Sequence, residues 1–167
     1  MYNAKSNMGI DPYSRLVSIP IHAEHIFHFP KGLPAFEHVK EFVFMHKPDL
    51  TPFVFMHALA PADLAFVCID PFGIYPDYKP KISESDLEFL HIKSPSDLLL
   101  LSIVTVSPDV KNTTTNLQGP IAINIQASLG KQIICENQHY PIRYRIWNVT
   151  ETVESQDNVR QRELVSA

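Results

Sequence analysis

The 167-residue sequence lacks the features of exported, membrane-spanning and disulfide-stabilised proteins. Its N-terminus has no apolar segment of the kind that a secretory signal needs. The longest apolar run, residues 98–101 continued by residues 103–104, is far shorter than the roughly 18 residues of a membrane span. The only two cysteines, Cys68 and Cys135, lie in apolar segments, which favours buried, reduced thiols over a disulfide. We therefore expect a cytoplasmic protein that does not enter a membrane.

Catalytic motifs are also missing. The sequence contains no Gly-x-Ser-x-Gly elbow, no His-Glu-x-x-His pair and no phosphate-binding loop. The tightest histidine cluster is His22, His25 and His28, but in a strand the middle histidine faces away from the other two, and Pro20 and Pro30 leave little room for a helix. We expect no metal, no cofactor and no enzymatic activity. The alternative is a small-ligand-binding or hydrolytic module on the same β scaffold.

The charge balance disfavours direct binding to nucleic acid. The formal net charge is −4 and the pI is about 6.0, whereas a protein that binds nucleic acid neutralises phosphates with an excess of basic side chains. A local basic stripe of Lys131, Arg143 and Arg145 is the one feature that could support RNA binding.

The composition indicates one globular domain made mainly of short strands. Apolar residues make up 45% of the chain and charged residues 19%, and 14 prolines outnumber five glycines. Alternating or continuous apolar patterns predict strands over residues 15–21, 25–29, 42–45, 53–56, 65–69 and 98–106. Three more are predicted over residues 121–126, 132–135 and 140–146, with short turns at 128–131 and 136–139 and with Gly130 at positive φ in the first turn.

One clear helix is predicted over residues 84–90. Ser83 is its N-cap, Asp86 occupies the capping-box position, and acidic residues fill the first turn. A second capped turn at residues 94–97 leads into the most apolar strand, which we expect at the centre of the core. Residues 1–14 are expected to form a flexible leader, residues 15–147 a single domain and residues 148–167 a polar tail.

Four segments, in order, resemble the flagellar assembly factor W family. They are the Gly-Leu-Pro corner at residues 29–36, the Phe-Val-x-x-x-Pro-Phe segment at 66–72, the capped helix, and Thr-x-Asn-Leu-x-x-Pro-Ile-x-Ile-Asn at 114–124. Gly130-Lys131-Gln132 and Tyr140-x-x-Arg143 follow. Ala35 stands where the family usually has glycine, a substitution that matters if the position requires positive φ.

The resemblance implies a fold and a function. The fold is mainly β, a small closed or pseudo-barrel of antiparallel strands with one or two short helices at one side, which agrees with the strand count. The function is that of a cytoplasmic factor that binds newly made flagellin. When free of flagellin, it binds the carbon storage regulator (CsrA), an RNA-binding repressor of flagellin translation, and relieves repression. The residues of the family motifs are predicted to be structural: Gly32, Leu33, Pro34, Phe36, Asn116, Leu117, Pro120 and Asn124.

Two features are candidate partner-binding surfaces. Acidic residues are concentrated in the middle third of the chain, where they either cap and solvate the fold or form a docking surface for a basic partner. The aromatic corner formed by Phe72, Tyr75 and Tyr78 either covers the core as a lid or forms an interface, since tyrosine is enriched in binding hot spots. The predicted contact residues are Phe72, Tyr75, Asp77, Tyr78, Glu84, Asp86 and Glu88.

Overall fold

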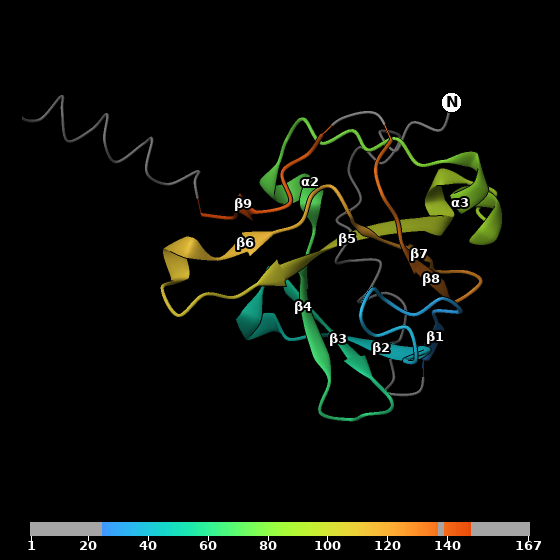
Figure 1. The fold of residues 1–167 in the computed structure, drawn as a ribbon, viewed down its shortest axis with the longest axis horizontal. Coiled ribbons are helices and arrows are strands. Elements are labelled where there is room, and N and C mark those ends of the chain that lie inside the picture. The colour runs from blue at the N-terminus through green and yellow to red at the C-terminus, as the bar shows by residue number, and fades with distance from the viewer. Residues whose placement is uncertain (1–24, 137–138, 148–167) are drawn as a thin grey trace, which may run out of the picture.

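The computed structural model describes residues 25–136 and 139–147, and Figure 1 shows its fold. The strands are β1 (Phe27–His28), β2 (Glu41–His46), β3 (Phe53–Ala58), β4 (Ala65–Ile69), β5 (Leu98–Thr105), β6 (Thr114–Thr115), β7 (Ile121–Asn124), β8 (Leu129–Gln132) and β9 (Tyr144–Arg145). The helices are the short α2 (Pro71–Ile74) and α3 (Glu84–Phe89), with 3-10 turns at Pro48–Leu50, Pro95–Asp97 and Val110–Asn112.

Seven of these strands close into a barrel. Their order is β4-β3-β2-β1-β8-β7-β5, and β5 pairs back with β4 to complete the ring, while β6 and β9 continue the sheet beyond β5. The prediction of a mainly β, barrel-like fold is therefore confirmed. One pairing differs from the expected antiparallel pattern, because β1 and β8 run parallel, with His28 opposite Leu129.

The most apolar strand, β5, lies at the centre as predicted. It pairs with β7 along its first half and with β4 and β6 further on. Leu99 and Leu101 face the main core inside the barrel, whereas Leu98 and Leu100 belong to a second cluster outside it. Both faces of the strand are covered, which explains why its sequence is continuously apolar rather than alternating.

The helix α3 covers the outer face of the barrel beside the start of β5 (Figure 1). Ser83 accepts a hydrogen bond from the backbone N–H of Asp86, so the predicted N-cap is confirmed. The capped turn Pro95–Asp97 is also as predicted, with a complete capping box between Ser94 and Asp97. The four-residue helix α2 was interpreted from sequence as an aromatic corner, since one turn is too short to show a helical period.

The predicted turn between β7 and β8 was placed too late. The turn lies at residues 125–128, and Ser128, not Gly130, takes a positive φ of 55°. Gly130 lies within β8, where a Cβ atom would come 2.1 Å from Cζ of Phe29. Glycine is required here for the close approach of the Phe29 ring rather than for turn geometry.

The prediction of a third long strand over residues 140–146 was wrong. Only Tyr144–Arg145 forms a strand, and it pairs with β6 rather than with β8. The preceding backbone is held by loop contacts, because Tyr140 donates its N–H to Oε1 of Gln118 and the carbonyl of Pro141 accepts from Leu117. Pro141 has no N–H to donate to a strand ladder.

The expected strand over residues 15–21 lies outside the described residues. The same holds for the leader, residues 1–14, the tail, residues 148–167, and His22 of the histidine cluster. The proposed domain boundaries therefore stay predictions.

Ala35 takes a φ of 68°, the left-handed region in which alanine is strained. We expect Ala35→Gly to raise the free energy of unfolding by about 0.5–1 kcal/mol, because relief of the strain exceeds the added entropy of the unfolded chain. Urea denaturation measures the change. The matched control is Ala127→Gly, an exposed turn alanine without positive φ, which should lose about 0.5 kcal/mol. Equal losses in both variants would contradict the assignment of strain.

Candidate protein-binding surface

The backbone conformation of the Gly-Leu-Pro corner, residues 29–36, requires glycine at position 32. Gly32 has a φ of 65°, and a Cβ atom there would come 2.7 Å from Cα of Glu37. Leu33 is buried in the main core, and Phe36 packs against that core with its ring edge-on to Phe66. Pro34 is exposed. Apart from Pro34, these positions support the structural role predicted for the motif.

The motif at residues 114–124 contains two asparagines that organise turns. Oδ1 of Asn116 accepts from the N–H groups of Gln118 and Gly119, both at 3.0 Å. Leu117 and Pro120 between them are buried. Asn124 is only 2% exposed, and its side-chain N–H groups donate to the carbonyls of Leu90 and His91. Its Oδ1 accepts from the N–H groups of Gln126 and Ala127. This geometry supports structural roles for all four residues.

The aromatic corner is a lid over a small core cluster. Tyr78 is 2% exposed, and its hydroxyl donates to the carbonyl of Leu117 at 2.7 Å. Burial raises the pKa of the Tyr78 hydroxyl far above its ordinary value. Phe72 and Tyr75 are half-buried and pack edge-on against the Tyr78 ring. The prediction that Tyr78 contacts a partner is therefore not supported, whereas Phe72 and Tyr75 keep part of their rings accessible.

The acidic candidates separate into one buried residue and three exposed ones. Asp86 is 8% exposed and pairs with the ammonium group of Lys131 on β8, so it ties α3 to the barrel instead of facing solvent. Asp77, Glu84 and Glu88 are exposed. Glu84 and Glu88 are one helical turn apart on α3 and therefore share a face.

The basic stripe considered for RNA binding does not form. Lys131 is engaged by Asp86 and also lies over the ring of Phe89, 5.3 Å from its centroid. Its strand, β8, is separated from β9, which carries Arg145, by β7, β5 and β6 in the sheet order. The three basic side chains are thus not neighbours along one strand face.

Comparison with known proteins identifies the family. The family model described as FliW protein matches residues 13–146. The chain is 38% identical over 135 residues to the flagellar assembly factor FliW of Moorella thermoacetica, which covers 80% of this chain and 85% of that protein. It is 39% identical over 127 residues to the flagellar assembly factor FliW of Anoxybacillus flavithermus, covering 76% and 86%. The chain belongs to the FliW family of flagellar assembly factors.

The fold agrees with that assignment. A crystal structure of the flagellar assembly factor FliW superposes with a TM-score of 0.71 at 36% sequence identity, covering 79% of this chain and 92% of that chain. The resemblance drawn from the four motifs is therefore confirmed, including the family membership and the mainly β barrel.

Among residues 25–136 and 139–147, no group of three or more His, Cys, Asp or Glu side chains could hold a metal ion. Within the same part of the chain, no helix has the length and apolar character to cross a membrane.

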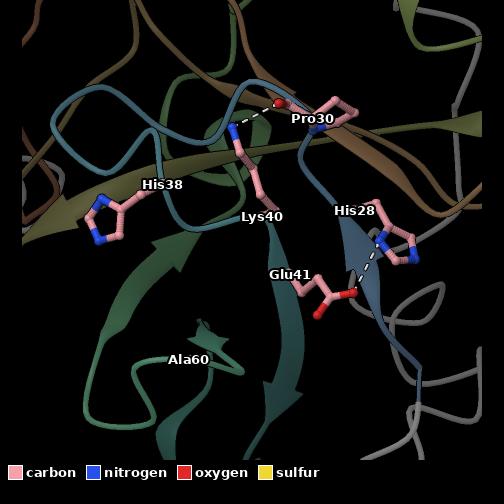
Figure 2. A pocket seen from close by; sticks show the side chains of 6 residues that line it. All are labelled: His28, Pro30, His38, Lys40, Glu41 and Ala60. Atoms are coloured by element: carbon pink, nitrogen blue, oxygen red, sulfur yellow. Dashed lines mark hydrogen bonds and ion pairs between the residues drawn. The ribbon is translucent and has the colours of Figure 1, made fainter.

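Sequence reasoning missed a polar pocket on the FliW barrel. It has a volume of about 390 Å³ and is lined by His28, Pro30, His38, Lys40, Glu41 and Ala60 (Figure 2). These residues come from β1, the corner after it, the start of β2 and the loop after β3. They meet only through strand pairing, so the sole sequence signal was the closeness of His38, Lys40 and Glu41 in the chain.

Proposed function

We propose that this chain is a partner switch that binds newly made flagellin and, when free of flagellin, binds the carbon storage regulator. Binding the regulator relieves its repression of flagellin translation. Flagellin concentration then sets how much factor remains for the repressor, since two ligands compete for one limiting protein. Membership of the FliW family supports this proposal, together with an exposed acidic helix face held rigidly on the barrel.

The contacts that anchor α3 to the barrel are the observation on which we base the choice of a repressor-binding surface. Asp86 pairs with Lys131, and the amide of Asn124 donates to the carbonyls of Leu90 and His91 just after the helix. Glu84 and Glu88 therefore project from a fixed platform. Acidic groups on a rigid platform suit a basic, RNA-binding partner, because complementary charge steers encounter and selects partners. We assign this face, with Asp77, to the repressor.

The half-buried aromatic residues are suited to flagellin. Phe72 packs against the same cluster as Leu87 and Phe89 of α3, so the aromatic corner adjoins the helix. The terminal segments of flagellin resemble amphipathic helices, which bind by laying an apolar face against accessible apolar side chains. Phe72 and Tyr75 supply such side chains. Adjacent sites on one side of the barrel also favour mutually exclusive binding.

The two cysteines are poorly suited to act as nucleophiles, which favours a binding protein over a hydrolytic module. Burial raises the pKa of the Cys68 thiol to about 12. Burial also raises the pKa of the Cys135 thiol, although its hydrogen bond with Tyr78 acts in the opposite direction. The thiolate is the reactive form, so neither cysteine is ionised at neutral pH. We infer that the chain performs no covalent chemistry and acts in the cytoplasm.

Charge reversal on α3 gives a specific prediction. The double variant Glu84→Lys/Glu88→Lys should associate with the repressor about tenfold more slowly at low salt, and its association should depend less on salt. Stopped-flow measurement over a salt series tests this, with circular dichroism to show that the fold is intact. The matched control is Asp49→Lys/Asp63→Lys, two exposed acids outside α3, which should retain most of the association rate. Unchanged kinetics of the α3 variant at low salt would rule this surface out.

The proposed function itself is tested with purified components. The chain is mixed separately with flagellin monomer and with the repressor, and each mixture is examined by isothermal titration calorimetry. We expect a saturable complex with each partner. Absence of binding to either one would overturn the switch, whatever the result for the α3 surface.

A further inference from the structure

An apolar patch is exposed where the sheet ends. The strands β6 and β9 continue the sheet beyond β5, and Trp147 follows two residues after β9 (Figure 1). The Trp147 ring is 39% exposed and lies edge-on to Phe53, with 6.4 Å between ring centroids. Val106 and Val110, in the loop between β5 and β6, are 64% and 60% exposed. We call Phe53, Val106, Val110 and Trp147 the terminal patch.

Backbone hydrogen bonds at Thr113 hold the parts of the terminal patch together. The N–H of Thr113 donates to the carbonyl of Val110 at 3.0 Å, and its carbonyl accepts from the N–H of Ile146 at 3.2 Å. Its hydroxyl accepts from the N–H of Ser107 at 3.2 Å. The loop after β5 and the chain after β9 are therefore fixed beside each other.

The terminal patch continues a buried cluster outside the barrel. Val104 and Ile146 are buried in this cluster, and Phe53 packs against them. Val106 follows Val104 by two residues, directly beyond the end of β5, and so faces the same side. A sheet face in contact with water usually carries polar residues, and contiguous exposed apolar side chains mark a surface that another segment or partner covers.

The chain after Trp147 starts at the terminal patch itself. The FliW family model ends at residue 146, so the 20 residues 148–167 lie beyond the part of the chain that it matches. Ten extended residues span roughly 33 Å, so reach does not limit contact with the patch. Val149 and Val153 are four residues apart, a spacing that places both side chains on one face of either a helix or a strand.

The charges of this segment and of the surface around the patch are complementary. Residues 148–157 contain no Lys or Arg and three acidic residues, Glu151, Glu154 and Asp157. Lys111 and Arg145 are exposed beside the patch, and neither forms an ion pair within residues 25–136 and 139–147. The nearby acid, Asp109, accepts hydrogen bonds from the N–H of Lys111 and the side-chain amide of Asn112. Complementary charge of this kind selects one partner segment over others.

We propose that residues 148–157 fold back over the terminal patch. Val149 and Val153 contact the exposed side chains of the patch, and the acidic residues lie beside Lys111 and Arg145. The segment thereby shields an apolar surface that would otherwise promote association with other chains. The terminal patch shares no residue with α3 or the aromatic corner, so this proposal does not rest on the partner switch.

Trp147 is the only tryptophan in the chain, so its fluorescence reports directly on the patch. In the full chain, Val149→Ser/Val153→Ser should raise the acrylamide quenching constant of Trp147 about twofold, because loss of two apolar contacts releases the segment and uncovers the ring. Val106→Ser/Val110→Ser, on the other side of the contact, should have the same effect. Unchanged quenching in the Val149→Ser/Val153→Ser variant would overturn the proposal.

Two control variants separate docking from a general loss of apolar surface. Val159→Ser/Val165→Ser changes the chain beyond residue 157, and Ile134→Ser changes an exposed apolar residue that is not part of the patch. Neither should alter the quenching of Trp147. If the Val159→Ser/Val165→Ser control raised quenching as much as Val149→Ser/Val153→Ser, the docking of residues 148–157 in particular would be contradicted.

Amide hydrogen exchange and dilution complete the test. Exchange in residues 148–157 should be about tenfold slower in the unmodified chain than in the Val149→Ser/Val153→Ser variant, because docking protects these amides. Equal rates in both would overturn the proposal. The quenching constant should not change when the protein is diluted. An increase on dilution would show that a second copy covers the patch, which would contradict docking within one chain.

Discussion

Replacing Gly130 with alanine should lower the free energy of unfolding by about 3 kcal/mol, at the upper end of the usual cost of overpacking a core. The new Cβ would meet three atoms of the Phe29 ring at 2.1–2.5 Å. That ring cannot move aside easily, because Phe29 is fully buried and packs edge-on against Phe42 with 5.0 Å between ring centroids. The clash also lies next to the parallel junction of β1 and β8, so the substitution should loosen the closure of the barrel.

Gly73→Ala is the matched control for this prediction. A Cβ atom at Gly73 would have only Oδ2 of Asp70 nearby, at 3.8 Å, and the residue lies in the helix α2. Alanine there should be neutral or stabilise the fold by up to about 1 kcal/mol. Urea denaturation of the two variants gives both numbers. A loss below about 1 kcal/mol for Gly130→Ala would show that the ring of Phe29 can be displaced at little cost.

Asn124→Ala should cost a similar amount, about 3–4 kcal/mol, for a different reason. The buried side chain of Asn124 donates to the carbonyl of Leu90 at 2.8 Å and to that of His91 at 3.1 Å. Its Oδ1 accepts from the N–H groups of Gln126 and Ala127, both at 2.9 Å. Alanine would leave these buried or half-buried groups without a partner and would remove a link between β7 and α3.

Asn116→Ala is the comparison for Asn124→Ala. Asn116 is half-buried and accepts two backbone hydrogen bonds, so its loss should cost about 1–2 kcal/mol. A second readout is amide hydrogen exchange, which should accelerate in residues 84–92 of the Asn124 variant and not in those of the Asn116 variant. If exchange in α3 stayed unchanged in both variants, Asn124 would not be the residue that holds the helix end to the barrel.

The parts of the fold that depend on nearby residues could be predicted from sequence. The caps at Ser83 and Ser94 and the apolar run of β5 were assigned correctly because their causes lie within a few residues. The turn at residues 125–128 was misplaced because we took Gly130 as a turn glycine. The residue must be glycine for another reason, the close approach of the Phe29 ring, and Phe29 is distant in sequence. A local signal for the correct position existed in Asn124, whose side chain accepts from the two N–H groups that begin the turn.

The candidate surface shows the same limit. The helix that carries Glu84 and Glu88 was predicted from its cap, and both residues are exposed on it, but their role as partner contacts stays a prediction. Asp86 and Tyr78 were placed with them, yet both are buried because their partners, Lys131 and Leu117, come from distant strands and loops. The polar pocket was missed for that reason too, as Lys40 and Ala60 meet only after the strands have paired.

The central claim is that the chain chooses between two partners, and the most direct test is a titration of flagellin into the preformed complex of this chain with the repressor, followed by size-exclusion chromatography. A full reversal from 99:1 to 1:99 requires a concentration-weighted preference of about 10⁴, or about 5.5 kcal/mol, part of which excess flagellin supplies. The account predicts that saturating flagellin releases free repressor and leaves a complex of the chain with flagellin. A stable peak that contains all three proteins in stoichiometric amounts would contradict it and would indicate an adaptor.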